Sequence, residues 1–280
     1  MLWNLGVTAA VAAVLMLAAA AVAVWVRGGR HDGVDVLWGA GFAVLALTTL
    51  AASGGSGGGD TWRRLLVTAL TVVWGGRLAW HIYTRNRGHD EDPRYQKMLA
   101  KAPGNPNLYA LRTVYLVQGV LLWLVSLPTQ LAQYGRGDTL FGEPAGWFVA
   151  GLGVAVWLVG FVFETVGDAQ LARFRADPAN RGTVMDRGLW RYTRHPNYFG
   201  DACVWWGLTL LALHHWIGLV SLVSAAVMTF LLVRGSGARL LESSIGQRRP
   251  GYADYISRTS GFFPLPPRKR QSRGSGQSVV

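Results

Sequence analysis

The sequence predicts an all-α fold: a polytopic membrane helix bundle of about seven transmembrane helices. Three observations lead to this prediction. Of the 280 residues, 51% are hydrophobic and only 15% are charged, well below the roughly 25% charged residues of soluble domains. Apolar runs of about 20 residues, the length that a helix needs to cross a bilayer, recur along the chain. Basic residues gather in alternate connections between these runs.

The predicted spans follow one another along most of the chain. They cover residues 2–26, 34–52, 62–83, 108–127, 145–166, 198–213 and 216–233. The first run has no basic start and is longer than the 7–15 apolar residues of a signal peptide, so we interpret it as a true helix. Only His214 and His215 separate the last two runs, which predicts a tight helical hairpin.

The distribution of arginine and lysine predicts the orientation of the bundle. Basic residues fill the connections after the first, third and fifth spans and the segment after the seventh. By the positive-inside rule the N-terminus lies outside and the C-terminus is cytoplasmic, in what we expect to be the bacterial inner membrane. Arg63 and Arg64 run against this trend. The net charge of +12 therefore indicates topology and contact with membrane lipids, and we expect no nucleic acid partner.

One membrane domain is expected over residues 1–265, followed by a basic, disordered C-terminal tail over residues 266–280. The glycine-rich stretch 53–59 lacks the strand and helix context of a dinucleotide fingerprint and is interpreted as a loop. Cys203, inside a span, is the single cysteine, so disulfides and cysteine-based metal sites are excluded. No metal site is predicted.

The segment 187–201 is the most informative part of the chain. Its arginines stand directly before a helix that should begin near Pro196, because proline suits the first helical turn. Free N–H groups at that start, with cationic side chains around them, form a site for phosphate or carboxylate. Asn197 and Asp201 fall one turn apart on one face of the helix, where polar groups inside the bilayer are costly unless they are used.

Two other spans carry polar side chains. Glu164 and Asp168 lie one turn apart at the expected cytoplasmic end of the fifth span, where they would suit ribose hydroxyls or a carboxamide; for Asp168 alone a solvated helix end is the simpler interpretation. Arg77 and His81 share a face of the third span, which makes His81 a candidate proton donor. Tyr83 points to the opposite side and is expected to pack between helices.

Two cytoplasmic segments leave alternatives open. The acidic stretch 90–92 and the residues after it form either a solvated turn or a functional patch. The segment 236–258 interleaves tyrosine and arginine, which could stack on and neutralise a nucleotide or anchor the chain at the membrane interface.

The motif 188–201, the element 92–96 and the end 248–266 resemble the bacterial DUF1295 proteins, membrane relatives of the steroid 5α-reductases. Isoprenylcysteine carboxyl methyltransferases carry a similar arginine-histidine-proline stretch. The resemblance implies a seven-helix bundle that binds NADPH in a cavity facing the cytoplasm. It implies cofactor contacts at Glu164, Asp168, Arg175, Tyr192, Arg194, His195, Asn197, Asp201, Arg239, Glu242, Tyr252, Tyr255 and Arg258.

The resemblance departs from the steroid enzymes at the proton donor. The family's histidine-tyrosine pair falls on His81 and Ile82, so the tyrosine is absent in that register, although Tyr83 is adjacent. We therefore take His81, Tyr83 and Arg77 as the catalytic candidates.

The predicted activity is an NADPH-dependent oxidoreductase that reduces an activated C=C bond, such as that of an enone, in a lipophilic small-molecule substrate. One alternative is a methyltransferase of the isoprenylcysteine type that uses S-adenosylmethionine. A second is a non-enzymatic membrane scaffold or carrier, which would bind neither ligand.

Overall fold

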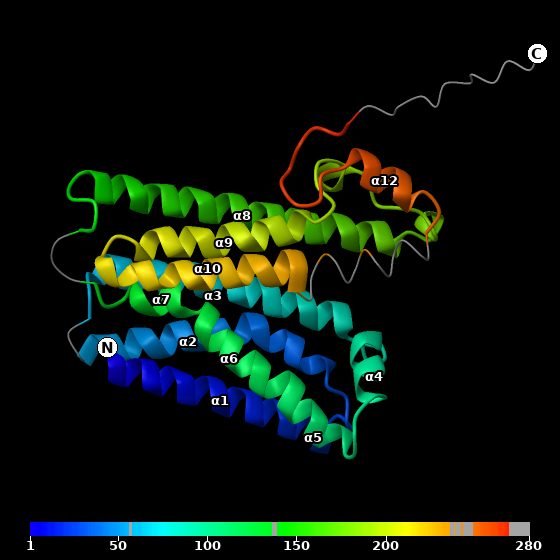
Figure 1. Cartoon of the computed structure of the whole chain (residues 1–280), viewed down its shortest axis with the longest axis horizontal. Coiled ribbons are helices and arrows are strands. Elements are labelled where there is room, and N and C mark those ends of the chain that lie inside the picture. Colours follow the sequence, from blue (N-terminus) through cyan, green and yellow to red (C-terminus); the bar gives the residue numbers. More distant parts are fainter. Residues whose placement is uncertain (56–57, 136–138, 236–237, 239–241, 243–248, 269–280) are drawn as a thin grey trace, which may run out of the picture. The chain divides into compact units, whose positions relative to one another are not determined.

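The computed structural model describes residues 1–55, 58–135, 139–235, 238, 242 and 249–268 (Figure 1). In this part of the chain every regular element is helical, and the one β-type contact is an isolated bridge between Thr193 and Ser260. The predicted all-α fold is therefore confirmed.

The helices follow the apolar runs closely. In chain order the α-helices are α1 (Leu2–Trp25), α2 (Val36–Gly55), α3 (Thr61–Asn86), α4 (Pro93–Leu99), α5 (Pro106–Ala110), α6 (Leu116–Val125), α7 (Leu127–Leu131), α8 (Ala145–Ala176), α9 (Pro196–Ala212), α10 (Ser221–Phe230) and α12 (Tyr252–Arg258). Short 3₁₀ or π turns join or extend them: η1 (Asp32–Asp35), η2 (Leu111–Tyr115), η3 (Pro178–Asn180), η4 (Gly188–Arg191), η5 (Trp216–Val220) and η6 (Leu231–Gly235).

Six continuous helical stretches of the described chain are long and apolar enough to cross a membrane. They are Leu2–Trp25, Asp32–Gly55, Thr61–Asn86, Pro106–Val125, Ala145–Ala176 and Trp216–Gly235. The sixth predicted span corresponds to α9, which has 17 residues, the lower end of the length that can span a bilayer. The count of seven spans and the orientation remain predictions.

Proline and capping side chains set several helix starts. Asp92 accepts a hydrogen bond from the Arg94 N–H ahead of Pro93, and Asn105 accepts from Asn107 and Leu108 ahead of Pro106. Helix α9 begins at Pro196, as the sequence predicted. Proline suits these positions because the first helical N–H has no partner within its helix.

Helix α8 is longer than the span predicted over 145–166. It has 32 residues and continues to Ala176, because the segment after Asp168 consists largely of good helix formers. Arg173 and Arg175 in the last turn also complement the negative end of the helix dipole. Glu164 and Asp168 therefore lie in the interior of a helix, and because Asp168 is buried, the interpretation of it as a solvated helix end was wrong.

The chain divides into two compact units. Unit 1 contains Met1–Ala155 and Trp205–Val227, and unit 2 contains Val156–Val204 and Met228–Val280. The four membrane-length stretches before α8 belong to unit 1, where α2 packs along α3 and α1 packs along α2 and α6 (Figure 1).

Aromatic side chains form the centre of unit 1. The rings of Phe42 and Trp205 are 4.6 Å apart, and Trp74 meets Trp205 edge-on at 5.3 Å. All three side chains are fully buried. These contacts join α2, α3 and the second half of α9 within the unit, and offset or edge-on ring pairs stabilise such packing beyond their buried area.

Candidate functional site

In unit 2, α8 and α9 approach each other closely at two glycines. A Cβ atom on Gly160 would lie 2.5 Å from the Gly200 carbonyl oxygen, and one on Gly200 would lie 2.5 Å from the Glu164 nitrogen. Small residues permit such backbone contact between membrane helices. The close approach places Glu164, only 3% exposed, directly at the interface between the two helices.

The predicted polar pairs of α8 and α9 meet at this interface. Asn197 Nδ2 donates to Asp168 Oδ1 over 3.1 Å, which joins one member of each pair. Asp168 and Asp201 are buried, at 8% and 9% exposure. The sequence predicted that each pair occupies one helix face but did not predict which residue of one pair meets which residue of the other.

A cavity of about 300 Å³ lies further along α8. Its walls are formed by Gln170, Arg173, Phe174, Asn180, Met185, Arg187 and Gly188. Sequence reasoning missed this lining and chose Arg175 instead, whose side chain is exposed and does not line the cavity. The spacing of Gln170, Arg173 and Phe174, at i, i+3 and i+4, is the pattern that could have identified it.

Arg194 makes its contacts with protein groups between Glu242 and Ser260. Its guanidinium pairs with both carboxylate oxygens of Glu242, at 2.8 and 3.3 Å, and donates to the carbonyls of Ile256 and Thr259 at 3.2 Å. Its backbone N–H donates to the Ser260 carbonyl. Arginine here caps the C-terminal carbonyls of α12 and fixes the segment beside the start of α9.

His195 completes the Arg194 cluster. Its Nε2 lies 2.8 Å from Glu242 Oε1, and its ring stacks on Tyr198 with 5.3 Å between centroids. Burial alone would raise the pKa of Glu242, but the His195 hydrogen bond and the charge of Arg194 outweigh it and hold that pKa below its usual 4.5. The carboxylate is therefore kept ionised by two partners.

Helix α12 supplies three of the predicted residues. Tyr255 is buried and donates to the Trp190 carbonyl over 2.5 Å, and Arg258 pairs with Asp186 at 2.6 Å. Burial raises the pKa of Tyr252 to about 12 and raises that of Tyr255 as well. Asp186, which the sequence reasoning passed over, is thus the partner that connects α12 to the loop before α9.

Two further predicted contacts in unit 2 have different outcomes. The Tyr192 side chain is 42% exposed, while its carbonyl accepts from the Leu265 N–H. Arg239 lies outside the described residues.

The three catalytic candidates all lie on α3 in unit 1. Arg77 and His81 are half-buried and one turn apart, so they share a helix face as predicted. Tyr83 is 48% exposed and lies against Trp80, with 6.1 Å between ring centroids. The expectation that Tyr83 packs between helices was wrong, because its position in α3 directs it to the outer surface of the unit.

The charged patch after residue 90 has a structural part. Arg94 pairs with Asp92 at 2.9 Å and with Asp35 at 3.0 Å, and the buried Tyr95 hydroxyl donates to Asp35 over 2.6 Å. The patch therefore ties α4 to the turn before α2, a structural role that was neither of the two interpretations left open by the sequence.

The architecture defines a polytopic, all-helical membrane protein. Within that class the chain belongs to the DUF1295 family, described as a protein of unknown function, whose model matches residues 21–259. It is similar to the uncharacterised protein C594.04c of Schizosaccharomyces pombe, with 26% identity over an alignment of 229 residues that covers 72% of this chain and 64% of the relative. The chain thus spans less than two thirds of that relative's length. No solved structure matches it.

Proposed function

We propose that the protein is a membrane-integral, NADPH-dependent reductase of an activated C=C bond in a lipophilic substrate. One observation carries the proposal: polar groups of two chemical kinds follow each other along α8. Buried acceptors come first, at Glu164 and Asp168. The cavity comes next, lined by Arg173 of α8 and by Arg187 of the loop before α9. The resemblance to the steroid 5α-reductases supports the same activity.

The donor set suits a dinucleotide. A carboxylate such as that of Asp168 accepts hydrogen bonds from ribose hydroxyls. An amide such as that of Asn197 can both donate a hydrogen bond to a carboxamide and accept one from it. Arginines bind phosphate oxygens bidentately. We assign the acceptors at the α8–α9 interface to the sugar and carboxamide of the cofactor and the arginine-lined cavity to its phosphates.

The arginines favour NADPH over S-adenosylmethionine. Both ligands carry a ribose and an adenine, so acceptors alone do not separate them. NADPH also carries several phosphate groups, whereas S-adenosylmethionine has a single carboxylate and a sulfonium cation. Arg173 and Arg187 at one cavity match the polyanion, and a sulfonium would gain nothing from them.

NADPH, when bound, supplies only the hydride, so the reduction needs a separate proton donor. We propose His81 as the acid that protonates the substrate carbonyl oxygen, with Arg77 lending positive charge to the developing oxyanion. Tyr83 is the weaker candidate, since it is half-exposed at the surface of its unit.

Isotope transfer tests the activity directly. Purified protein in detergent micelles is incubated with lipophilic enones and NADPH deuterated at the nicotinamide C4, and products are examined by mass spectrometry. We expect deuterium at the β-carbon of a saturated product. His81→Ala should lower the rate by about 10²–10⁴-fold, while Tyr83→Phe, the control, changes it little. Transfer of a methyl group from S-adenosylmethionine instead would contradict the proposal.

A further inference from the structure

At one end of unit 1 the structure brings together three side chains to which the sequence assigned no role in ligand binding. Asp60 precedes α3, and His214 and His215 form the turn between α9 and η5. One ligand atom from each lies within 4.8 Å of the others, and His215 Nε2 is 3.9 Å from Asp60 Oδ2. We propose that these three residues bind a divalent transition metal ion, with Zn²⁺ as the best match.

The chemistry of the ligands favours this metal. Two imidazoles and a carboxylate are the ligand types that zinc takes in proteins, at about 2.0–2.2 Å from the ion. In a tetrahedral site such atoms stand roughly 3.3 Å apart, so ligands within 4.8 Å need only small side-chain rotations. Hard cations such as Mg²⁺ and Ca²⁺ prefer an all-oxygen set, which this turn does not offer.

Both histidines are already oriented. His214 Nδ1 lies 3.3 Å from the Gly146 carbonyl oxygen, which can only accept, so Nδ1 carries the proton and Nε2 keeps its lone pair. Metal-ligating histidines commonly donate their other ring N–H to a carbonyl in this way. Both histidines are buried, His214 at 3% exposure and His215 at 5%.

The His215 ring fits against a glycine. A Cβ atom on Gly135 would lie 1.9 Å from His215 Cδ2, so any larger residue at position 135 would displace the ring. The site therefore has imidazoles that are packed in place, which reduces the conformational entropy lost when an ion binds.

Arg63 is the group that opposes a cation here. Its side chain is fully buried, and its NH2 lies 2.8 Å from Asp60 Oδ2. A carboxylate has two oxygens and several lone pairs, so Asp60 can hold the guanidinium and a metal ion together. The Asp60 side chain is 44% exposed, which leaves it room to turn toward the histidines.

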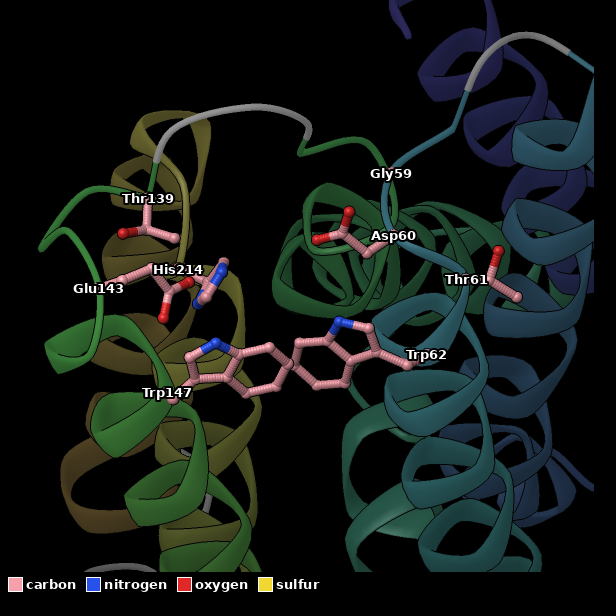
Figure 2. A pocket seen from close by; sticks show the side chains of 8 residues that line it. All are labelled: Gly59, Asp60, Thr61, Trp62, Thr139, Glu143, Trp147 and His214. Atoms are coloured by element: carbon pink, nitrogen blue, oxygen red, sulfur yellow. The ribbon is translucent and has the colours of Figure 1, made fainter.

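A cavity of about 790 Å³ gives an ion access to the site. It is lined by Gly59, Asp60, Thr61, Trp62, Thr139, Glu143, Trp147 and His214 (Figure 2). Figure 2 shows the rings of Trp62 and Trp147 meeting below Asp60 and His214, and the two indoles stack at 4.8 Å. With three protein ligands, the fourth position is open to a water molecule in this cavity.

Zinc titration tests the proposal without NADPH, so its outcome is independent of the proposed reductase activity. Tag-free protein in micelles competes with a chromophoric chelator for Zn²⁺. We expect one ion per chain, and at least about tenfold weaker binding in Asp60→Asn, His214→Gln and His215→Gln. Glu143→Gln, in the same cavity, and His89→Ala, an exposed histidine elsewhere, are matched controls that should keep the affinity within twofold.

Two results would overturn the site. One is the absence of saturable binding to the unsubstituted protein, and the other is equal weakening by the controls. Because the histidine variants could unfold, X-ray absorption of the zinc-loaded unsubstituted protein provides a second measurement. The scattering pattern of two imidazoles is expected, and a spectrum without imidazole would exclude His214 and His215 as ligands.

Discussion

Arg94 in unit 1 and Arg194 in unit 2 both pair with carboxylates, yet their surroundings differ. The Arg94 side chain is 57% exposed and bridges Asp92 and Asp35. The Arg194 side chain is 15% exposed, and its guanidinium meets four acceptors, two of them on Glu242. Similar distances therefore describe a solvated contact in one case and a closed cluster in the other.

The difference gives a criterion for separating structural arginines from candidate ligand-binding arginines in this protein. An arginine whose guanidinium donates to several acceptors of the protein, such as Arg194, holds a segment in place. Arginines on a cavity wall, such as Arg173 and Arg187, remain able to contact a ligand. Removal of each kind should have different consequences for stability and for binding.

The largest effect on stability is expected from Arg194→Ala. It leaves Glu242 with His195 as its remaining partner and removes the donor to two carbonyls. Breaking a largely buried ion pair costs about 3–5 kcal/mol. Chemical denaturation in mixed micelles measures the change, with Arg194→Lys as the control that keeps the charge but loses the bidentate geometry. A loss no greater than that of Arg94→Ala would show that the two arginines are equivalent.

A smaller loss should follow Tyr255→Phe. The substitution removes the donor to the buried Trp190 carbonyl, and an unsatisfied buried acceptor costs about 1–3 kcal/mol. Tyr252→Phe is the matched control, since among the described residues no hydrogen bond of its hydroxyl is recorded. Equal losses from the two variants would mean that ring packing, not the hydrogen bond, matters at position 255.

Acid should weaken the Arg194 cluster through Glu242. The pKa of Glu242 is held below its ordinary value of 4.5 in the folded protein. The ionised side chain therefore contributes its full stabilisation above pH 4.5, and this stabilisation is lost as the pH falls through the lower pKa of the folded state. The difference in unfolding free energy between unsubstituted protein and Glu242→Gln should therefore shrink on acidification. A difference independent of pH below 4.5 would contradict this assignment.

The smallest effect is expected from Arg94→Ala. Exposed ion pairs contribute about 0–1 kcal/mol, and Tyr95 keeps its own hydrogen bond to Asp35. The same denaturation experiment measures the change. A loss above about 2 kcal/mol would show that the bridge between α4 and the start of α2 is stronger than its exposure suggests.

Apolar length and proline position were enough to predict most helices. The start of α9 at Pro196 and the turn at His214 and His215 followed from the sequence, because such signals are local. The end of α8 did not, since charged but helix-forming residues after Asp168 carry the helix beyond the apolar run. The division into two units was also outside the reach of a hydropathy pattern.

The sequence predicted which residue types form the candidate site, but it did not predict which of these residues contact each other. Buried Asp168 and Asn197 were expected on their own helices, whereas their hydrogen bond depends on the close approach at Gly160 and Gly200. The role of Arg194 required Glu242, 48 residues away. Long-range pairing of this kind is decided by tertiary packing, which a single sequence does not display.

Ligand binding by the purified protein tests the central claim most directly. Calorimetry with NADPH and with S-adenosylmethionine should show binding of NADPH alone. Asn197→Ala should weaken that binding about two- to tenfold, the equivalent of one hydrogen bond of 0.5–1.5 kcal/mol, and Asp201→Ala should weaken it as well. Binding of S-adenosylmethionine without NADPH, or unchanged NADPH affinity in both folded variants, would contradict the account.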